Sequence, residues 1–402
     1  MTPSKRSRLI GVTCAAMTQH GVIMLLAGAL LPAMMETFDI LEGAAGIMLG
    51  AGALGFIIGP MLSGLLSDRK GVKASYLVGF AAEIVLLIAM GLAPSFYVAV
   101  AAFFFLNIAA GFIETSVNVV PALVGNGKSG SLMNVVHVFF SIGAFISPFL
   151  IGLLLTTIGS WRPVWLLAII PTAILLVAVA ALRFPRAARM ESTTAAPRPG
   201  KLQVLRERAI LMGAIAMMLY VAAEFGASNW ITLYLNKELG FATLAATSGL
   251  SILWLGLLVG RLINARLALF RASGELVWWS GLGGLVTGLL LLTAQTPVMA
   301  YVWLFGLGIF MGGIFPNIMA ELNGRNPERT GLITGFLAQS AGLGSLIAQP
   351  MLGFVGERAG LAVSMGLVAG FMGLVSVVIY LGAGSMAALR HQAPPAPAKS
   401  QA

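Results

Sequence analysis

Charged residues are scarce in this sequence. Asp, Glu, Lys and Arg together make up 9% of its 402 residues, whereas a soluble domain typically has about a quarter. A soluble protein of this length needs those charges to cover its surface, so the composition excludes a water-soluble fold. The hydrophobic fraction of 58% and the mean hydropathy of +0.95 instead indicate a helical protein whose surface faces the lipid bilayer.

Cysteine is almost absent as well. The single residue, Cys14, excludes both an internal disulfide framework and a cysteine metal site. The apolar stretches contain no triad of metal ligands, no nucleophile elbow and no phosphate-binding loop, and there is no sizeable soluble domain. We therefore expect no metal, no cofactor and no enzymatic activity.

The net charge of +10 is concentrated in particular segments of the chain. With the amino terminus inside, only Arg162, Lys237 and Arg358 of the 24 basic residues fall in outer segments, and Arg261 falls within an apolar stretch. This distribution follows the positive-inside rule, so it is explained without a nucleic-acid partner. We expect both termini in the cytoplasm and a location in the bacterial inner membrane.

Apolar runs separated by polar breaks predict an all-α membrane protein with twelve transmembrane helices. The expected spans are 9–37, 43–66, 74–93, 96–123, 131–156, 161–182, 209–235, 241–268, 275–295, 298–322, 330–355 and 361–384.

The spans divide into two sets of six. A polar segment, 183–208, lies midway and predicts a cytoplasmic linker between a bundle at 1–182 and a bundle at 209–390, followed by a disordered tail at 391–402. Weak internal repetition at equivalent spans supports duplication of one half. The matched pairs are Asn118 with Asn317, Gly125 with Gly324, His137 with Gln339, and Pro148 with Pro350.

The loop after the second span reads Gly-Leu-Leu-Ser-Asp-Arg-Lys-Gly-Val-Lys over residues 64–73. It resembles the loop signature of the major facilitator superfamily, Gly-x-x-x-Asp-Arg-x-Gly-Arg-Lys, and departs from it at Val72. The resemblance implies two six-helix bundles that rock about a central substrate site. We expect Gly64 to permit close helix approach, Asp68 to pair with a cation or a helix end, and Gly71 to form a tight turn. The candidate conformational gate is Gly64, Asp68, Arg69 and Gly71.

Three shorter stretches carry a narrower resemblance. They read Gly-Phe-Ile-Glu-Thr-Ser-Val-Asn at 111–118, Ile-Phe-Pro-Asn-Ile at 314–318 and Gln-Pro-Met-Leu-Gly-Phe-Val at 349–355. These resemble the fucose:proton symporter family of sugar permeases, which implies sugar-like solutes moving with protons and a role for Glu114. Where that family has an acidic residue in the first span, this chain reads Ala-Gly-Ala-Leu-Leu-Pro at 27–32, so its proton chemistry is expected to be placed differently.

Ionisable side chains within the spans are informative because a charge at bilayer depth is costly unless it is paired or hydrated. Glu114 in the fourth span and Glu224 in the seventh are the candidate proton-coupling residues. Arg261 and His137 are candidates for substrate binding, and His20 is a weaker one. The alternative for each is a structural hydrogen bond or ion pair.

Neutral polar groups within the spans complete the candidate substrate site. Side-chain amides offer both donors and acceptors to a hydroxyl-rich ligand, and the flat face of Trp230 suits a sugar ring. The alternatives are hydrogen bonds between helices and, for Trp230, a place in the interfacial aromatic belt. The candidate substrate-binding residues are Asn118, Asn134, His137, Asn229, Trp230, Arg261, Asn317 and Gln339.

These features favour a monomeric secondary transporter that couples a small polar solute, such as a sugar, to protons. Two alternatives keep the fold, namely a proton-driven efflux pump for drugs and a carrier of organic anions with Arg261 as counter-charge. A receptor that binds a solute without moving it is a further possibility. The embedded amides favour the polar solute.

Overall fold

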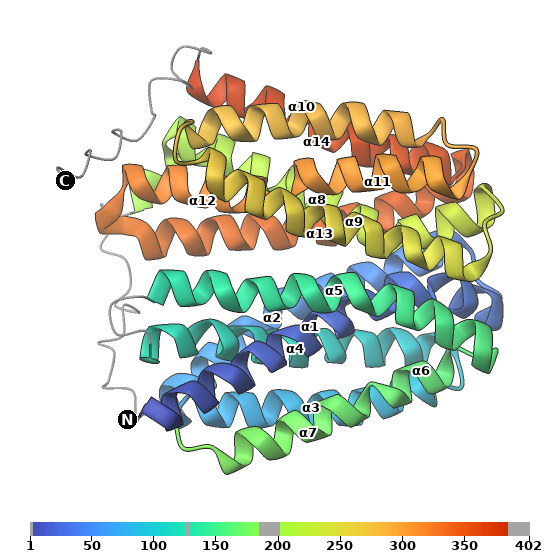
Figure 1. Cartoon of the computed structure of the whole chain (residues 1–402), viewed down its shortest axis with the longest axis horizontal. Coiled ribbons are helices and arrows are strands. Elements are labelled where there is room, and N and C mark those ends of the chain that lie inside the picture. The colour runs from blue at the N-terminus through green and yellow to red at the C-terminus, as the bar shows by residue number, and fades with distance from the viewer. Residues whose placement is uncertain (1–2, 125–128, 185–201, 385–402) are drawn as a thin grey trace, which may run out of the picture. The chain divides into compact units, whose positions relative to one another are not determined.

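The structure is a computed structural model of the chain and describes residues 3–124, 129–184 and 202–384. All regular elements in these residues are helices (Figure 1). A helix satisfies its own backbone N–H and C=O groups by internal hydrogen bonds, which is necessary because lipid hydrocarbon offers no hydrogen-bond partners. The bounds are α1 (Pro3–Phe38), α2 (Glu42–Lys70), α3 (Val72–Gly91), α4 (Phe96–Val124), α5 (Ser129–Ile158), α6 (Arg162–Leu167), α7 (Ile169–Ala181), η1 (Leu202–Arg206), α8 (Arg208–Leu233), η2 (Tyr234–Glu238), α9 (Thr243–Leu267), α10 (Ser273–Leu291), α11 (Pro297–Met311), α12 (Ile314–Arg325), η3 (Pro327–Arg329), α13 (Thr330–Ala359) and α14 (Leu361–Ala383).

Twelve stretches of the described residues are long and apolar enough to cross a membrane. They confirm the predicted all-α architecture, and their bounds differ from the predicted ones by a few residues. The first, for example, covers Lys5–Phe38 where 9–37 is predicted. Some spans contain more than one element: α6 and α7 form the sixth, α8 and η2 the seventh, α11 and α12 the tenth, and η3 and α13 the eleventh.

Two spans are broken just before a proline. The sixth is interrupted at Ala168, between α6 and α7, and the tenth at Gly312, between α11 and α12. Pro171 and Pro316 follow these breaks. Because proline has no N–H, the carbonyl groups of Leu167 and Gly312, four positions earlier, lose their helical donors. Prolines also lie inside the continuous helices α1, α2, α4, α5 and α13, so proline contributes to these two breaks but does not determine them alone.

The described residues form two compact units that do not coincide with the two halves of the sequence. The first compact unit holds the described part of Met1–Thr194 together with Ser228–Ser251 and Leu346–Leu361. The second holds the described parts of Ala195–Ala227, Ile252–Ser345 and Ala362–Ala402. The division into bundles at 1–182 and 209–390 stays a prediction. Most of the expected linker at 183–208 and the whole tail at 391–402 lie outside the described residues.

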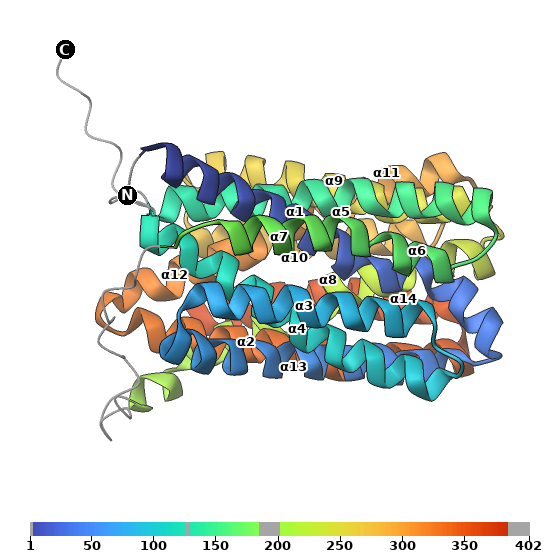
Figure 2. The same cartoon turned by 90° about the horizontal axis from the view of Figure 1, so that it is seen from below.

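The same three helix pairings occur in both units. In the first, α1 packs on α5, α2 on α4, and α3 on α7 (Figures 1 and 2). In the second, α8 meets α13 at Gly344, α9 meets α11 at Gly256, and α10 meets α14 at Gly281. Counted by span within each half, these are first with fifth, second with fourth, and third with sixth. The recurrence is what the weak sequence repeat predicts.

Glycines on α2 permit two close helix contacts. A Cβ atom at Gly55 would meet the backbone carbonyl of Phe104 on α4. A Cβ atom at Gly46 would instead meet the backbone carbonyl of Gln349 on α13. Since backbone cannot move aside as a flexible side chain can, both positions require glycine for this packing.

Candidate functional site

Asn118 and His137, both predicted to bind substrate, lie together in the first compact unit. Asn118 is on α4 and His137 on α5, and the Asn118 Oδ1 atom is 3.1 Å from His137 Nε2. Both side chains are partly exposed. Asn134, one turn before His137 on α5, has a side chain outside the described part of the structure. An amide and an imidazole on facing helices can together offer donors and acceptors to a polar solute.

Glu114 lies one helical turn before Asn118 and on the same face of α4. Its side chain is partly exposed, and it makes no hydrogen bond or ion pair with any described residue. His20 of α1 is 2% exposed and packs between the rings of Phe56 and Phe140. Glu114 therefore has a carboxyl group beside the Asn118–His137 pair, whereas His20 sits in an aromatic environment.

Glu224 and Arg261 form an ion pair in the second compact unit. Glu224 of α8 and Arg261 of α9 approach to 3.8 Å, with exposed side-chain fractions of 8% and 27% respectively. Tyr220 lies one turn earlier on α8 and is 1% exposed. The structure thus joins a predicted coupling carboxylate to a predicted substrate-binding cation, and each largely neutralises the other.

Trp230 and Asn229 lie in helix contacts of the first compact unit. Trp230 is 0% exposed, and its indole N–H donates to Gln349 Oε1 of α13 at 2.9 Å. A Cβ atom at Gly28 of α1 would meet the backbone of Ser228 and Asn229. In this conformation Trp230 presents no open face to a solute, and its contact with substrate stays a prediction.

Asn317 of α12 pairs with an amide that the sequence analysis did not single out. Its Nδ2 atom donates to Asn264 Oδ1 of α9 at 3.1 Å, and Asn264 Nδ2 donates to the Gly260 carbonyl at 3.0 Å. Asn317 and Asn264 are 5% and 8% exposed. The pair links two helices, which is the structural alternative for a buried amide. Gln339 of α13, by contrast, is exposed.

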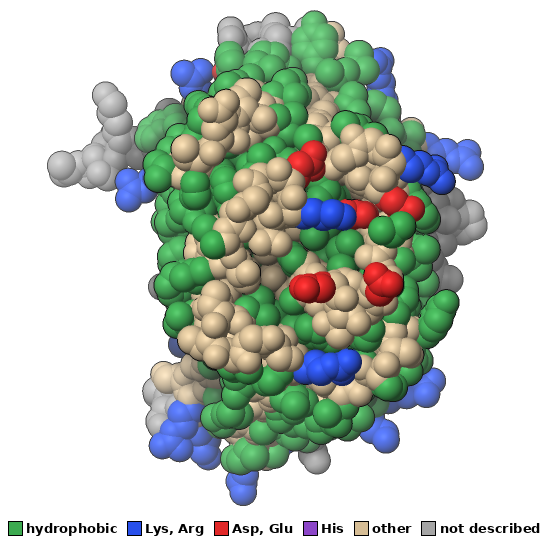
Figure 3. Space-filling model, turned by 90° about the vertical axis from the view of Figure 1, so that its right-hand side faces the viewer, with side chains coloured by type: hydrophobic (Ala, Val, Ile, Leu, Met, Phe, Trp, Pro, Cys, Tyr) green, Lys and Arg blue, Asp and Glu red, His purple; other side chains and the backbone are tan. Residues whose placement is uncertain are grey.

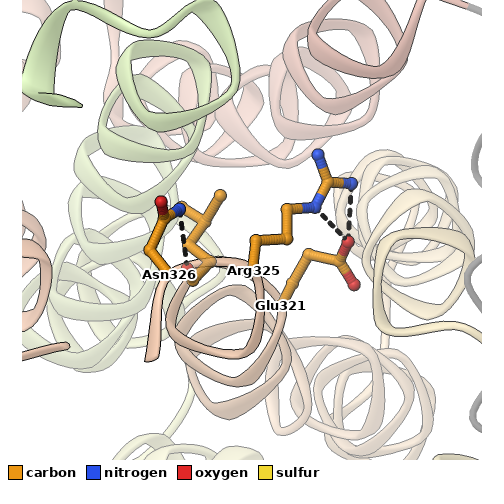
Figure 4. Close-up of polar contacts among 4 residues, drawn as sticks. Glu321, Arg325 and Asn326 are labelled. Atoms are coloured by element: carbon orange, nitrogen blue, oxygen red, sulfur yellow. Dashed lines mark hydrogen bonds and ion pairs between the residues drawn. The ribbon is translucent and has the colours of Figure 1, made fainter. Parts of the chain in front are cut away.

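Asn317 also lines a pocket within the second compact unit, between residues of α8, α10, α12 and α14. The pocket has an empty volume of about 460 Å³ that includes open solvent. Glu321 and Arg325 reach its lining from α12, and both Nε and Nη2 of Arg325 donate to Glu321 Oε1, at 2.9 and 2.7 Å (Figure 4). Asn326 lies on the other side of that helix. Because the two charges pair, the pocket offers no net charge to a ligand.

The candidate gate lies at the junction of α2 and α3. Gly71 has a φ of 85°, and its N–H donates to the Ser67 carbonyl at 2.8 Å, which is the expected tight turn. Asp68 and Arg69 are exposed, and Asp68 has no cation or helix end as partner among the described residues. Apart from its chain neighbours and the backbone of its own helix, no described atom lies within 4 Å of a Cβ position at Gly64, so the expected close approach is not made in this conformation. The gating role stays a prediction.

A set of polar contacts between α2 and distant parts of the chain was not expected from the sequence. Lys237 of η2 lies 2.5 Å from Glu42 Oε1 of α2, and the Gly43 N–H donates to Glu357 Oε2 of α13 at 2.9 Å. Figure 3 shows a face of the protein on which acidic and basic side chains lie close together. Glu42 is only 4% exposed although it begins a helix. Its partner is 195 residues away, so sequence spacing gave no signal.

A second unexpected cluster lies among α1, α3 and α7. Gln19 Nε2 donates to Glu83 Oε1 and, at 2.8 Å, to Thr172 Oγ1. The Thr172 hydroxyl lies 3.0 Å from the same Glu83 oxygen. Glu83 stands in the middle of an apolar run, so the reasoning that selected Glu114 applies to it equally and would have found it.

Residues 12–349 match the model of the Major Facilitator Superfamily. The chain belongs to that superfamily. It is therefore a multi-pass secondary transporter that binds a solute, and not an enzyme.

Individual relatives are distant. Bypass of stop codon protein 6 from Saccharomyces cerevisiae is 25% identical over 326 residues, covering 72% of this chain and 65% of that protein, which is less than two thirds of its length. A variant of the nucleoside transporter NupG has a TM-score of 0.80 at 13% identity, over 95% of this chain and 100% of that one. A D-xylose-proton symporter has a TM-score of 0.74 at 15% identity, over 94% and 98%. At these identities the likeness to solved structures concerns the fold.

Proposed function

We propose that this protein is a proton-coupled symporter of a sugar or a similar hydroxyl-rich solute. The observation that carries the proposal is the group on α4 and α5, in which Glu114 lies one turn from the Asn118–His137 pair. We place the substrate beside that pair and the coupling proton on Glu114.

Glu114 suits proton exchange better than Glu224 because of its surroundings. A carboxylate in an ion pair loses that pair when it takes up a proton, and Glu224 faces Arg261. Glu114 has no such partner among the described residues and is partly exposed, so it can gain or lose a proton without breaking a contact. Glu224 remains the alternative coupler.

The choice of solute rests on the neutral polar groups. Amides and an imidazole recognise hydroxyl groups, whereas a pump for hydrophobic drugs would need an apolar site. The pairing of Arg261 with Glu224 weighs against an organic anion, because that cation is already neutralised. The short resemblance to the fucose:proton symporter family, and the likeness in fold to a D-xylose-proton symporter, agree with a sugar.

The transport cycle is proposed to be alternating access in a monomer whose termini lie in the cytoplasm. On that orientation, Glu42, Lys237 and Glu357 lie at the outer side. Their contacts would close that side in the conformation described here. Asp68 and its loop would act at the cytoplasmic side.

The test begins with the solute. A thermal-shift screen of the purified protein against sugars, sugar acids and efflux substrates identifies ligands, because binding to the folded state raises apparent stability. Uptake of the best ligand is then measured in liposomes with an imposed pH gradient. Glu114→Gln keeps size and hydrogen bonding but removes titration, so we expect it to abolish gradient-driven accumulation. The matched control is Glu36→Gln, which changes an exposed carboxyl group at the end of α1 and should leave accumulation intact.

Exchange of labelled for unlabelled solute requires no net proton movement. It should therefore persist in Glu114→Gln if the side chain only couples, and loss of both activities would mean that Glu114 also binds the solute. Unimpaired accumulation by Glu114→Gln would eliminate it as coupler and direct attention to Glu224. Selective binding of hydrophobic drugs without any sugar binding would favour the efflux alternative.

A further inference from the structure

The cluster of Gln19, Glu83 and Thr172 is closed to water and holds a carboxyl group far from any helix end. Glu83 and Thr172 are 0% exposed and Gln19 is 4% exposed. The three side chains come from α1, α3 and α7, so one cluster ties together the first, third and sixth spans. Gln19 Nε2 and Thr172 Oγ1 both donate to one oxygen of the carboxyl group, Glu83 Oε1, while Gln19 also donates to Thr172 and the Thr172 hydroxyl also lies 2.9 Å from the Ala168 carbonyl oxygen.

The other carboxyl oxygen, Glu83 Oε2, has no hydrogen-bond partner, and neither does Gln19 Oε1. Both atoms are inaccessible to water. These two unpartnered oxygens belong to side chains that already share a hydrogen bond. Two acceptors without a donor are costly in a dry interior, and a proton on Glu83 Oε2 would turn one of these two acceptors into a donor.

The surroundings of Glu83 offer no counter-charge. Away from the helix ends, the titratable side chains on α1, α2, α4, α6 and α7 are Cys14, His20 and Glu114, and Tyr76 lies on α3 itself. None of them makes a hydrogen bond or ion pair with Glu83, and no Lys or Arg of the described residues does so. An isolated carboxylate at that depth would be strongly unfavourable, whereas a neutral acid is tolerated.

We propose that Glu83 is a carboxylic acid that holds a proton in this conformation, and that Gln19, Glu83 and Thr172 form a buried proton-binding site distinct from Glu114. The acid donates through Oε2 to Gln19 Oε1 and accepts from the Gln19 amide through Oε1. Thr172 donates to the same Oε1 atom. The additional hydrogen bond from Glu83 Oε2 to Gln19 Oε1 is therefore present only while Glu83 is protonated.

This proposal does not depend on the nature of the transported solute, because it is tested by stability. If folding retains the proton, stability falls as the pH rises, since the folded state then binds more protons than the unfolded one. Unfolding temperatures of the full-length protein in detergent are measured from about pH 6 to about pH 9 for the wild type, Glu83→Gln and the control Glu36→Gln. Glutamine mimics the neutral acid, since it also has one donor side and one acceptor side.

We expect wild type and Glu36→Gln to lose several degrees of unfolding temperature across this range. Glu83→Gln should match the wild type at the acid end and lose most of the alkaline fall. A fall of unchanged size in Glu83→Gln would overturn the proposal, because other groups would then cause it. Destabilisation of that variant by the same amount at every pH would also overturn the proposal, because Glu83 would then be needed as a charge.

Poor folding of Glu83→Gln would not leave the question open, because a spectroscopic measurement is available. In a Glu114→Gln protein, Glu83 is the buried acid within the described spans that has no cation beside it. The infrared spectrum of that variant at neutral pH should retain a carboxylic-acid carbonyl band that exchanges slowly with deuterated water. Absence of the band would refute the presence of a proton on Glu83.

Discussion

The ion pair between Glu224 and Arg261 predicts an unequal response to removal of its two members. At 3.8 Å and an effective dielectric constant of about 20, the attraction is about 4 kcal/mol. Removing Arg261 leaves Glu224, whose side chain is 8% exposed, without its cation. Removing Glu224 leaves Arg261, whose side chain is 27% exposed and can recover part of its hydration. We therefore expect Arg261→Met to destabilise the protein more than Glu224→Gln does.

The size of the effect can be bounded. Breaking a buried pair typically costs about 3–5 kcal/mol, and the partial exposure of Arg261 places this pair near the lower figure. The double variant Glu224→Gln with Arg261→Met removes both charges and should recover much of the loss. A double-mutant cycle should then give a coupling energy of about 2–3 kcal/mol.

The assay is thermal unfolding of purified protein in detergent, compared at neutral and at acid pH. At acid pH Glu224 can take up a proton, so the penalty of Arg261→Met should shrink while that of Glu224→Gln stays the same. Equal destabilisation by the two single variants, together with a coupling energy near zero, would show that this pair does not contribute to stability in the way its burial implies.

Three further predictions concern the gate, the helix contacts and the contacts of Glu42. Asp68→Asn should slow transport but leave solute affinity in equilibrium binding within a few-fold, because the residue is exposed and is not part of the group formed by Glu114, Asn118 and His137; complete loss of binding would contradict this. Gly55→Ala should reduce the yield of folded protein on size-exclusion chromatography, whereas Gly64→Ala, with open space around it, should not; equal yields would contradict the packing argument. Lys237→Gln removes the cation that pairs with Glu42 and so weakens the proposed closure of this side. A cysteine placed at the buried Ser228, in a Cys14→Ser background, should then react faster with an impermeant maleimide. An unchanged rate would show that the pair does not help to close this side.

The fold could be predicted from the sequence because its main determinant is local. Each span is a long apolar run that must form its own backbone hydrogen bonds within the bilayer, so hydropathy alone locates the helices. Pro171 and Pro316 contribute to the interruption of the sixth and tenth spans, but prolines inside other spans leave their helices continuous, so the sequence does not locate the breaks. The compact units could not be predicted, because they depend on which distant helix ends touch.

The candidate site was predictable only in part. Residue type and depth selected Asn118, His137, Glu224 and Arg261, and the structure brings these together in two pairs, although their roles stay predictions. Pairing itself could not be inferred, since the partners lie on different helices. Glu83 lies within an apolar run, so the rule for charges within a span applies to it as it does to Glu114.

The contacts joining Glu42 to Lys237, Gly43 to Glu357 and Trp230 to Gln349 set a limit on how firmly this end of the protein holds together. A half-exposed ion pair contributes well under about 1 kcal/mol, a neutral hydrogen bond about 1 kcal/mol, and a hydrogen bond to a carboxylate about 1.5–3 kcal/mol. The three contacts together amount to about 3–5 kcal/mol, which would keep the opposite state at about one part in a thousand. In the proposed cycle these contacts hold this side closed only weakly, so solute and proton binding can release them. A leucine added among these contacts would therefore slow turnover, because the extra apolar contact would stabilise the closed state too strongly.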